Sequence, residues 1–233
     1  LRLVVIFNFR DTMKKRSGDE VLEEYLECIY KLEEKFKVAR TSEIVKSLEL
    51  SPGTVTNTLR RLRRMGYIIH HPYRGVRLTE KGRKIAIDVI RKHRLSERLL
   101  TDLLKLEWEK SHNAACRLEH SISEEIARLL DEALNHPKTC PHGNPIPTES
   151  GKVFDESCLP LSSLKAGIQC EVVKVTDESV QLLQYLKSVG LVPGALVEIL
   201  NIEPFDGPIT IRVGTRQQAL NRKVASLIQV KQR

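Results

Sequence analysis

Apolar residues in the first part of the chain recur with the period of amphipathic helices. Between residues 18 and 36 they return every three or four positions, which predicts one helix with a buried face. A polar pair ahead of apolar residues predicts a second helix over 41–48. A third helix is expected after Ser51, whose hydroxyl can cap it. Pro52 fits the first helical position, and the helix ends near Gly66.

The pattern then changes to short runs typical of strands. Residues 67–71 and 76–79 predict two strands, joined by a turn at 72–75 that contains proline and glycine. Helices followed by a β-hairpin in this order indicate a winged helix-turn-helix. In such a domain the second helix of the helix-turn-helix pair lies in the major groove of DNA.

The remainder of the chain divides into a helical part and a strand-rich part. Apolar positions predict one long helix over 80–106 and a further helix over about 111–134. Residues 135–160 are rich in proline, glycine, serine and threonine, which is typical of a linker or an irregular loop. Beyond them, short apolar runs predict a small β-barrel-like domain with strands at 172–175, 196–199, 209–213 and 227–230.

Charge is distributed unevenly along the chain. Residues 1–83 hold 18 Lys and Arg against 11 Asp and Glu, a net of +7, whereas the other 150 residues hold 20 against 19, a net of +1. An anionic partner for the basic part is one interpretation of this asymmetry, and ordinary solvated charge is the other.

Length and composition exclude several classes of protein. A hydrophobic content of 41% fits soluble globular domains, of which 233 residues can form two or three. No run of 18 apolar residues is present, so no membrane span is expected. The apolar stretch 1–9 is too short to span and lacks the cleavage site of a signal peptide, and Met13 is a candidate start of translation. Five cysteines without a CxxC pair indicate a reducing, cytoplasmic environment.

The helix expected after Ser51 carries side chains suited to DNA. Its first half offers small or hydrogen-bonding groups that can approach base edges, and its second half offers arginines that can neutralise phosphates. A basic surface helix without a ligand would have the same composition, but the hairpin and the charge asymmetry favour DNA binding. The candidate DNA-binding residues are Ser51, Pro52, Thr54, Thr56, Asn57, Arg60, Arg61, Arg64 and, in the hairpin, Arg74.

A second group of side chains has the composition of a metal site. The segment 112–120 places a histidine, a cysteine, a glutamate and another histidine at i, i+4, i+7 and i+8, along one face of a helix. Imidazole, thiolate and carboxylate are ligands of first-row transition metals. The four residues are His112, Cys116, Glu119 and His120.

Two other helices offer further ligand types. His93 and Glu97 are four residues apart on the long helix, and Glu24 and Glu27 are three apart on the first helix. Either pair alone would ordinarily be solvated charge. Cys116 could equally be a small buried apolar residue. The evidence for metal is therefore the combination of the three segments.

Several segments between residues 23 and 147 match one protein family in order and spacing. They are EYL at 24–26 with IY at 29–30, SPGTV at 51–55, LTEKG at 78–82, RKHRLSERLL at 91–100, ACRLEH at 115–120 and GNPIP at 143–147. With these segments the chain resembles the diphtheria toxin repressor family of iron- and manganese-dependent regulators. Its strand-rich end is similar to the SH3-like domain of the longer members, which is related to FeoA-like ferrous-iron transport accessory proteins.

The resemblance implies two metal positions per subunit. One would use Glu24, Cys116, Glu119 and His120, and the other would use His93, Glu97 and His112. Iron-type members usually have Met where this chain has Glu24. Manganese-type members have carboxylates at the positions of Glu24 and Glu27, but usually have Glu where this chain has Cys116. The chain is thus a hybrid, and its thiolate favours iron over manganese.

The resemblance also implies a contribution from the SH3-like domain, which in iron-type members adds a carboxylate and an amide to the second position. Here Glu178 and Gln181 are the candidates, and Glu27 is an alternative ligand there. The expected cofactor is Fe(II) or Mn(II). Zinc, Co(II) or Ni(II) could also bind in vitro, because intrinsic affinity does not follow biological role.

The expected fold class is α+β, with three domains. These are a winged helix-turn-helix DNA-binding domain over 13–86, a helical dimerisation and metal-binding domain over 87–147, and, after a linker over 148–160, an SH3-like (FeoA-like) β-barrel over 161–233.

The expected function is that of a homodimeric, metal-dependent transcriptional repressor. The metal would fix the angle between the DNA-reading domain and the dimer core. Two recognition helices would then match successive major grooves of a double-stranded operator, about 34 Å apart. The family implies metal-uptake genes as targets, and neither a membrane nor a small organic substrate is expected as a partner.

Three other interpretations are less well supported. A metal-independent winged-helix regulator with a small-molecule sensing domain is the main alternative. A metalloenzyme is disfavoured because no HExxH or other hydrolase signature is present. A structural zinc site at Cys140 and His142 is disfavoured because two ligands are too few for a closed tetrahedral site.

Overall fold

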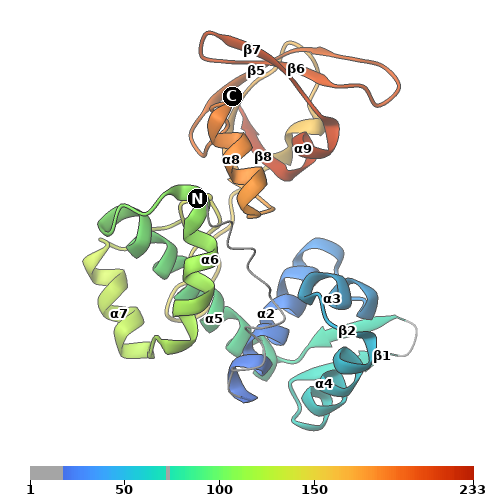
Figure 1. Cartoon of the computed structure of the whole chain (residues 1–233), viewed down its shortest axis with the longest axis vertical. Coiled ribbons are helices and arrows are strands. Elements are labelled where there is room, and N and C mark those ends of the chain that lie inside the picture. The colour runs from blue at the N-terminus through green and yellow to red at the C-terminus, as the bar shows by residue number, and fades with distance from the viewer. Residues whose placement is uncertain (1–17, 72–73) are drawn as a thin grey trace, which may run out of the picture. The chain divides into compact units, whose positions relative to one another are not determined.

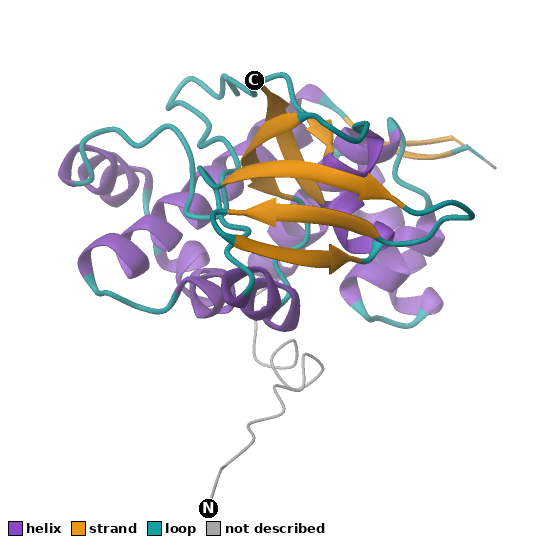
Figure 2. Ribbon diagram, turned by 90° about the horizontal axis from the view of Figure 1, so that it is seen from above, coloured by secondary structure: helices purple, strands orange, loops and turns teal. Residues whose placement is uncertain are grey.

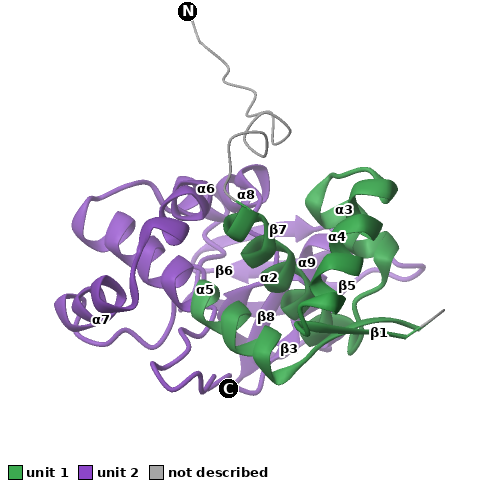
Figure 3. Ribbon diagram, turned by 90° about the horizontal axis from the view of Figure 1, so that it is seen from below, with its two compact units in different colours: residues 1–90 green, residues 91–233 purple. Residues whose placement is uncertain are grey.

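Residues 18–71 and 74–233 are described by the computed structural model of the chain. The candidate start at Met13 and the middle of the predicted turn, Pro72 and Tyr73, lie outside these residues. The chain divides into two compact units, residues 1–90 and 91–233, each with a hydrophobic core of its own (Figure 3). Within the described residues no helix is long and apolar enough to cross a membrane.

The first unit contains the three helices and the hairpin that the sequence predicts (Figure 1). Its elements are α2 (Gly18–Phe36), α3 (Thr41–Leu48), α4 (Pro52–Arg64), β1 (Ile68–His71) and β2 (Gly75–Leu78). The predicted cap of α4 is confirmed, since Oγ of Ser51 accepts a hydrogen bond from the Thr54 amide at 3.2 Å and Pro52 is the first helical residue. The two strands pair antiparallel, with Ile68 opposite Leu78.

One apolar core holds these elements together. Tyr25 of α2, Ile44 of α3, Val55 and Leu62 of α4, and Val76 of β2 are all completely buried in it. Because α4 turns its apolar face inward, its polar and basic face is left exposed. This is the arrangement expected of a recognition helix.

The second unit begins inside the long helix α5 (Glu80–Arg98), which is followed by the π-helical turn η1 (Leu99–Leu103). The single helix predicted over 80–106 is therefore wrong at its end. Hydrogen bonding widens after Arg98, and the Leu104 amide donates to the Leu99 carbonyl, five residues back. Leu103 and Leu104 are exposed and Lys105 has a positive φ of 56°, so the apolar pattern in this stretch is not accompanied by burial within the chain.

The single helix predicted over 111–134 is also wrong. The structure has α6 (Trp108–Leu118), the 3₁₀ turn η2 (Glu119–Ser121) and α7 (Glu124–Ala133). Ile122 is extended, and Oγ of Ser123 caps α7 by accepting a hydrogen bond from the Ile126 amide at 3.2 Å. Serine side chains compete for backbone hydrogen bonds in this way and interrupt helices. Glu119 and His120 consequently lie on the turn after α6 rather than on one helical face with His112 and Cys116.

The strand-rich end contains β3 (Leu159–Pro160), β4 (Gln169–Val175), β5 (Leu196–Ile202), β6 (Ile209–Val213), β7 (Arg216–Leu220) and β8 (Ile228–Gln232), with the helices α8 (Val180–Ser188) and α9 (Arg222–Leu227). The strands form one antiparallel sheet in the order β3-β8-β4-β5-β6-β7, of the SH3-like type (Figure 2). The predicted strands lie in β4, β5, β6 and β8. Strand β7 and helix α8 were missed; β7 is mostly polar and exposed, with only Leu220 buried.

The proline- and glycine-rich segment after α7 is irregular, as predicted, but its first part is packed rather than free. Cys140, His142 and Ile146 are buried. The Val175 amide of β4 donates to the His142 carbonyl at 3.0 Å. A Cβ atom on Gly143 would lie 2.0 Å from the Val173 carbonyl oxygen, so the loop backbone approaches β4 as closely as glycine allows.

Candidate metal centre and DNA-reading helix

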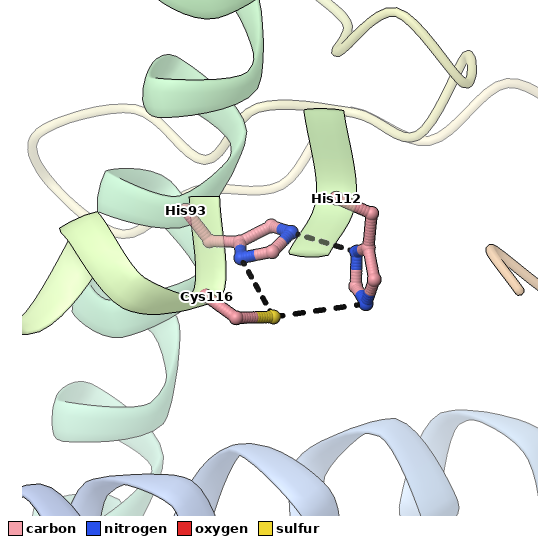
Figure 4. A group of neighbouring side chains, drawn as sticks. All are labelled: His93, His112 and Cys116. Atoms are coloured by element: carbon pink, nitrogen blue, oxygen red, sulfur yellow. Dashed lines mark hydrogen bonds between the residues drawn. The ribbon is translucent and has the colours of Figure 1, made fainter. Parts of the chain in front are cut away.

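Side chains from α5 and α6 converge in the second unit. His93 projects from α5 toward His112 and Cys116, which lie one turn apart on α6 (Figure 4). Nε2 of His93 lies 3.1 Å from Nδ1 of His112, and Sγ of Cys116 lies 3.9 Å from Nδ1 of His93 and 3.7 Å from Nε2 of His112. One donor atom from each of these three residues lies within 4.8 Å of the other two, so ligand types of transition metals gather at this point.

The His93 ring separates two groups of predicted ligands. Its Nδ1 faces Glu119 on η2, with 2.5 Å to Oε2, and its Nε2 faces Glu97 on the next turn of α5, with 3.1 Å to Oε1. Glu119 in turn has its Oε1 3.3 Å from Nε2 of His120. His93 therefore touches ligands of both sets that the resemblance assigns, although it was placed in only one of them.

The SH3-like domain brings one of its two candidate ligands to this group. Glu178, just before α8, has its Oε2 2.8 Å from Nδ1 of His112. Asn144 holds this carboxylate by donating from Nδ2 to Oε1 at 2.7 Å. Gln181, the other candidate, is exposed on α8 and stays a prediction.

Two residues that sequence reasoning set aside also lie here. Cys140 and His142 were rejected as a metal site because they lacked partners, and the structure supplies Glu97 and Glu178 as partners. Nδ1 of His142 lies 3.2 Å from Oε1 of Glu97 and 3.7 Å from Oε1 of Glu178. The Cys-Pro-His motif was the available signal, but the two carboxylates are remote in sequence.

The electrostatics of the cluster are those of closely spaced opposite charges. Burial lowers the pKa of His93, but attraction to Glu97 and then Cys116 outweighs it and raises this pKa well above the ordinary value. Burial raises the pKa of Glu97, but attraction to His93 outweighs it and holds this pKa well below its usual range. For Cys116, burial is outweighed by His93 and His112, which lower its pKa to about 7. Protonated imidazoles thus balance the anions, and a divalent cation would displace these protons.

Neighbouring charges also outweigh burial at Glu178, but not at Cys140. Burial and the neighbouring Glu97 act to raise the pKa of Glu178. The effect of His112 is opposite and outweighs them, so the pKa is lowered to about 2. Burial, followed by the charges of Glu97 and Glu178, raises the pKa of Cys140 well above its ordinary value. This thiol would lose its proton only to a cation that binds sulfur.

The two predicted carboxylate ligands of α2 belong to the first unit. Glu24 is buried, and Glu27 is mostly buried and forms an ion pair with Lys31 at 2.8 Å. The role of both glutamates as metal ligands stays a prediction.

The predicted DNA-binding side chains share the outer face of α4 and the end of the hairpin turn. All are exposed except Thr56, which is half-buried and donates to the Pro52 carbonyl at 2.8 Å. Oδ1 of Asn57 accepts a hydrogen bond from Nη1 of Arg60 at 3.2 Å, so the amide and the guanidinium lie beside each other at the surface. The exposed members are Ser51, Pro52, Thr54, Asn57, Arg60, Arg61, Arg64 and Arg74.

Comparison with protein families matches almost all of the described chain. Residues 19–76 match the iron dependent repressor N-terminal DNA binding domain, and residues 79–148 match the iron dependent repressor metal binding and dimerisation domain. Residues 159–232 match the FeoA domain.

Individual relatives match over nearly their whole length. The chain is 38% identical over 224 residues to the iron-dependent repressor IdeR of Mycobacterium tuberculosis, covering 91% of this chain and 96% of the relative. It is 34% identical over 227 residues to the diphtheria toxin repressor of Corynebacterium diphtheriae, covering 91% and 97%. Among solved structures, a manganese-dependent transcriptional repressor in complex with manganese superposes with a TM-score of 0.84 at 27% identity, covering 91% of this chain and 100% of that chain. IdeR of T. acidophilum superposes with a TM-score of 0.78 at 28% identity, covering 94% and 100%.

Proposed function

The chain belongs to the iron-dependent repressor family, which includes the diphtheria toxin repressor, and from this membership we propose that it is a metal-activated transcriptional repressor. It binds double-stranded operator DNA as a homodimer and acts in the cytoplasm on genes of metal uptake. One observation carries the proposal: a buried cluster of histidine, cysteine and carboxylate ligands occurs in a chain that also presents an exposed basic recognition helix.

The cluster residues fit a divalent transition metal on chemical grounds. Oε2 of Glu97 is buried and has no hydrogen-bond partner among the described residues, a costly arrangement unless a cation binds there. The donors combine imidazole nitrogen, carboxylate oxygen and thiolate sulfur, which suits Fe(II), and also Mn(II), Zn(II) or Co(II). We assign Glu24, Cys116, Glu119 and His120 to one metal position and His93, Glu97, His112 and Glu178 to the other, with Glu27 as an alternative ligand.

The charges of the ligand cluster explain how metal would control DNA binding. A bound divalent ion supplies the positive charge that the imidazole protons supply otherwise. Glu119 and His120 lie on a 3₁₀ turn between two helices, and Glu178 lies in a loop of the SH3-like domain, so these ligands come from separate segments of the chain. Ligation would hold these segments together in one arrangement. A coupling of about 1–3 kcal/mol per site between metal and DNA would give a clear response.

DNA reading is assigned to the first unit. Thr54 and Asn57 at the start of α4 reach base edges, Arg60, Arg61 and Arg64 contact phosphates, and Arg74 of the hairpin contacts the adjacent backbone. The domain bounds proposed for these roles are 13–86 for DNA binding, 87–147 for metal and dimerisation, and 161–233 for the SH3-like domain. No catalytic activity is proposed, because the relatives are repressors.

Operator binding in the presence and absence of metal tests the proposal. Binding to a DNA fragment from the protein's own upstream region would be measured at fixed ionic strength, first with a chelator and then with Fe(II) or Mn(II). We expect tight binding only with metal, and its loss in Glu119→Ala and His120→Ala. Glu149→Ala, which removes an exposed carboxylate outside the predicted ligands and the dimer contact, is the matched control. Equal binding with and without metal would instead identify a metal-independent winged-helix regulator.

A further inference from the structure

Two carboxylates in the second unit each face two different groups of ligands. Oε1 of Glu97 lies within reach of three imidazoles, with 3.1 Å to Nε2 of His93, 3.4 Å to Nδ1 of His112 and 3.2 Å to Nδ1 of His142. Glu178 divides its two oxygens, with Oε2 2.8 Å from Nδ1 of His112 and Oε1 3.7 Å from Nδ1 of His142. Both carboxylates therefore stand between the His93–His112 pair and His142.

The surroundings of His142 determine which of its two nitrogens faces the carboxylates. Its Nε2 lies 3.1 Å from the Trp108 carbonyl oxygen, an acceptor only, so Nε2 carries the hydrogen in the neutral ring. Nδ1 is then left with its lone pair directed at Glu97 and Glu178. The ring is completely buried, and Nδ1 has no hydrogen-bond partner among the described residues. A backbone carbonyl that fixes the outer nitrogen is the usual support of a histidine ligand.

Cys140 completes a second set of donors beside this ring. It is buried two residues before His142, in the loop that Gly143 seats against β4. Donor atoms of Glu97, Cys140, His142 and Glu178 all lie within 4.8 Å of one another, and the same holds for His93, Glu97, His112 and Glu178. The two sets of four share both carboxylates and no other residue.

We propose that this pocket holds two divalent ions side by side, one between His93 and His112 and one between Cys140 and His142, bridged by Glu97 and Glu178. Each ion has four protein ligands. Carboxylate-bridged pairs in proteins lie about 3.5–4 Å apart, a spacing compatible with two sets whose donors overlap in this way. One dication balances the two carboxylates while the Cys140 thiol keeps its proton, and a second dication bound with the thiolate brings the net charge to +1, so neither state leaves a large uncompensated charge.

The two positions differ in chemistry. The first has two imidazoles and suits Fe(II) or Mn(II), whereas the second has a thiolate and favours softer ions such as Fe(II), Co(II) or Zn(II) over Mn(II). The thiol of Cys140 must release its proton to the solvent when its ion binds. The inference rests on the proposed function, because it assumes that the His93–His112 position binds metal.

Cobalt content and spectroscopy test the paired site without a measurement of DNA binding. The full chain would be saturated with Co(II) under anaerobic conditions and freed of loosely bound ions. Cobalt per subunit would be measured by elemental analysis, and the ions located in a crystal by anomalous scattering. We expect Cys140→Ser and His142→Gln each to lose one ion per subunit and to weaken the near-ultraviolet thiolate-to-cobalt absorption. Magnetic coupling seen by electron paramagnetic resonance should give way to the signal of an isolated ion.

Matched controls separate the loss of an ion from the loss of the fold. Cys158→Ser changes a half-buried cysteine outside the cluster, and His136→Gln changes an exposed histidine. Both should keep the full cobalt content. Glu178→Gln keeps the side-chain shape and should lose the coupling.

Two outcomes would overturn the proposal. One is a wild-type crystal with a single anomalous peak among these residues, and the other is unchanged cobalt content in both Cys140→Ser and His142→Gln. If one ion binds there and DNA binding still requires metal, only the paired site fails. If no ion binds and DNA binding ignores metal, the proposed function fails with it.

Discussion

The carboxylate of Glu33 accepts a hydrogen bond from the backbone amide of Leu78 at 2.8 Å, across 45 residues of sequence. Its other oxygen pairs with Nη2 of Arg83 at 2.6 Å. Nearby, the amides and carbonyls of Ala39 and Val76 exchange hydrogen bonds. The end of α2 is thereby joined to the second strand of the hairpin, so the helix that carries Glu24 and the wing that carries Arg77 belong to one rigid body.

Removal of this buried carboxylate should destabilise the first unit. Glu33→Ala leaves the Leu78 amide buried without its acceptor, which costs about 1–3 kcal/mol in the free energy of unfolding. Glu33→Gln keeps an acceptor and should cost less, because the lost partner Arg83 is 33% exposed and its ion pair is weakened by solvent. Chemical denaturation measures both values. Glu34→Ala, an exposed neighbour on the same helix, is the control, and an equal effect of both alanines would contradict the prediction.

Local pattern was sufficient for the first unit, since its helices and hairpin have regular periodicity and explicit boundary residues. Ser51 and Pro52 start α4 as their chemistry requires. The Glu33–Leu78 bond was beyond the sequence, because a glutamate on an amphipathic helix has the same local pattern whether it faces solvent or a distant amide.

In the second unit periodicity was less informative. The helix predicted over 111–134 is interrupted at Ser123, where one cap outweighs continuous apolar spacing. The regular spacing of His112, Cys116, Glu119 and His120 was therefore interpreted on a helix that does not extend so far. Cys140 and His142 appeared to lack partners because Glu97 and Glu178 reach them only through the tertiary fold.

Arg60 on the outer face of α4 should contribute to DNA affinity without regard to base sequence. Arg60→Ala should weaken binding to operator and unrelated DNA alike. It should also reduce the slope of log K against log salt by about 0.9 per subunit, as for one phosphate contact. Fluorescence anisotropy over a salt series provides the slope. Arg128→Ala on α7, equally basic and exposed, should leave it unchanged, and a loss confined to the operator would show that Arg60 reads bases instead.

Cys116 should be the most readily alkylated cysteine near neutral pH in the metal-free protein. Its pKa is lowered to about 7, so its thiolate fraction, and with it the alkylation rate, rises as pH increases through about 7. Cys158 is similarly half-buried, but burial raises its pKa, so it should react at higher pH. Mass spectrometry of iodoacetamide-treated peptides gives both profiles. Saturating Fe(II) or Co(II) should suppress the Cys116 reaction, and equal labelling with metal present would argue against its role as a ligand.

Gly143 should resist substitution more strongly than other glycines of positive φ. Alanine costs about 1–2 kcal/mol in left-handed backbone at either Gly143 or Gly167. Of these two positions, Gly143 would also place the new Cβ 2.0 Å from a carbonyl oxygen, whereas at Gly167 it meets nothing within 4 Å. Unfolding followed by the fluorescence of Trp108, whose Nε1 donates to the Pro141 carbonyl of the same loop, compares the two variants. Equal losses would mean that the loop can move away from β4.

The outer face of α7 should form part of the contact between two copies of the chain. Ile126 and Leu129 are 46% and 50% exposed and lie three residues apart on one side of the helix, within the segment that matches a dimerisation domain. The double variant Ile126→Arg, Leu129→Arg places like charges opposite each other in a two-fold interface and removes apolar burial, so it should convert dimer to monomer. Sedimentation analysis at micromolar concentration measures this. Operator affinity should fall with it, because each monomer reaches only one half-site.

Phe205→Arg in the SH3-like domain, where the side chain is fully exposed, should leave the dimer intact. A stable dimer of the α7 variant would place the interface elsewhere on the helical domain, with the exposed Leu103 and Leu104 as the next surface to alter.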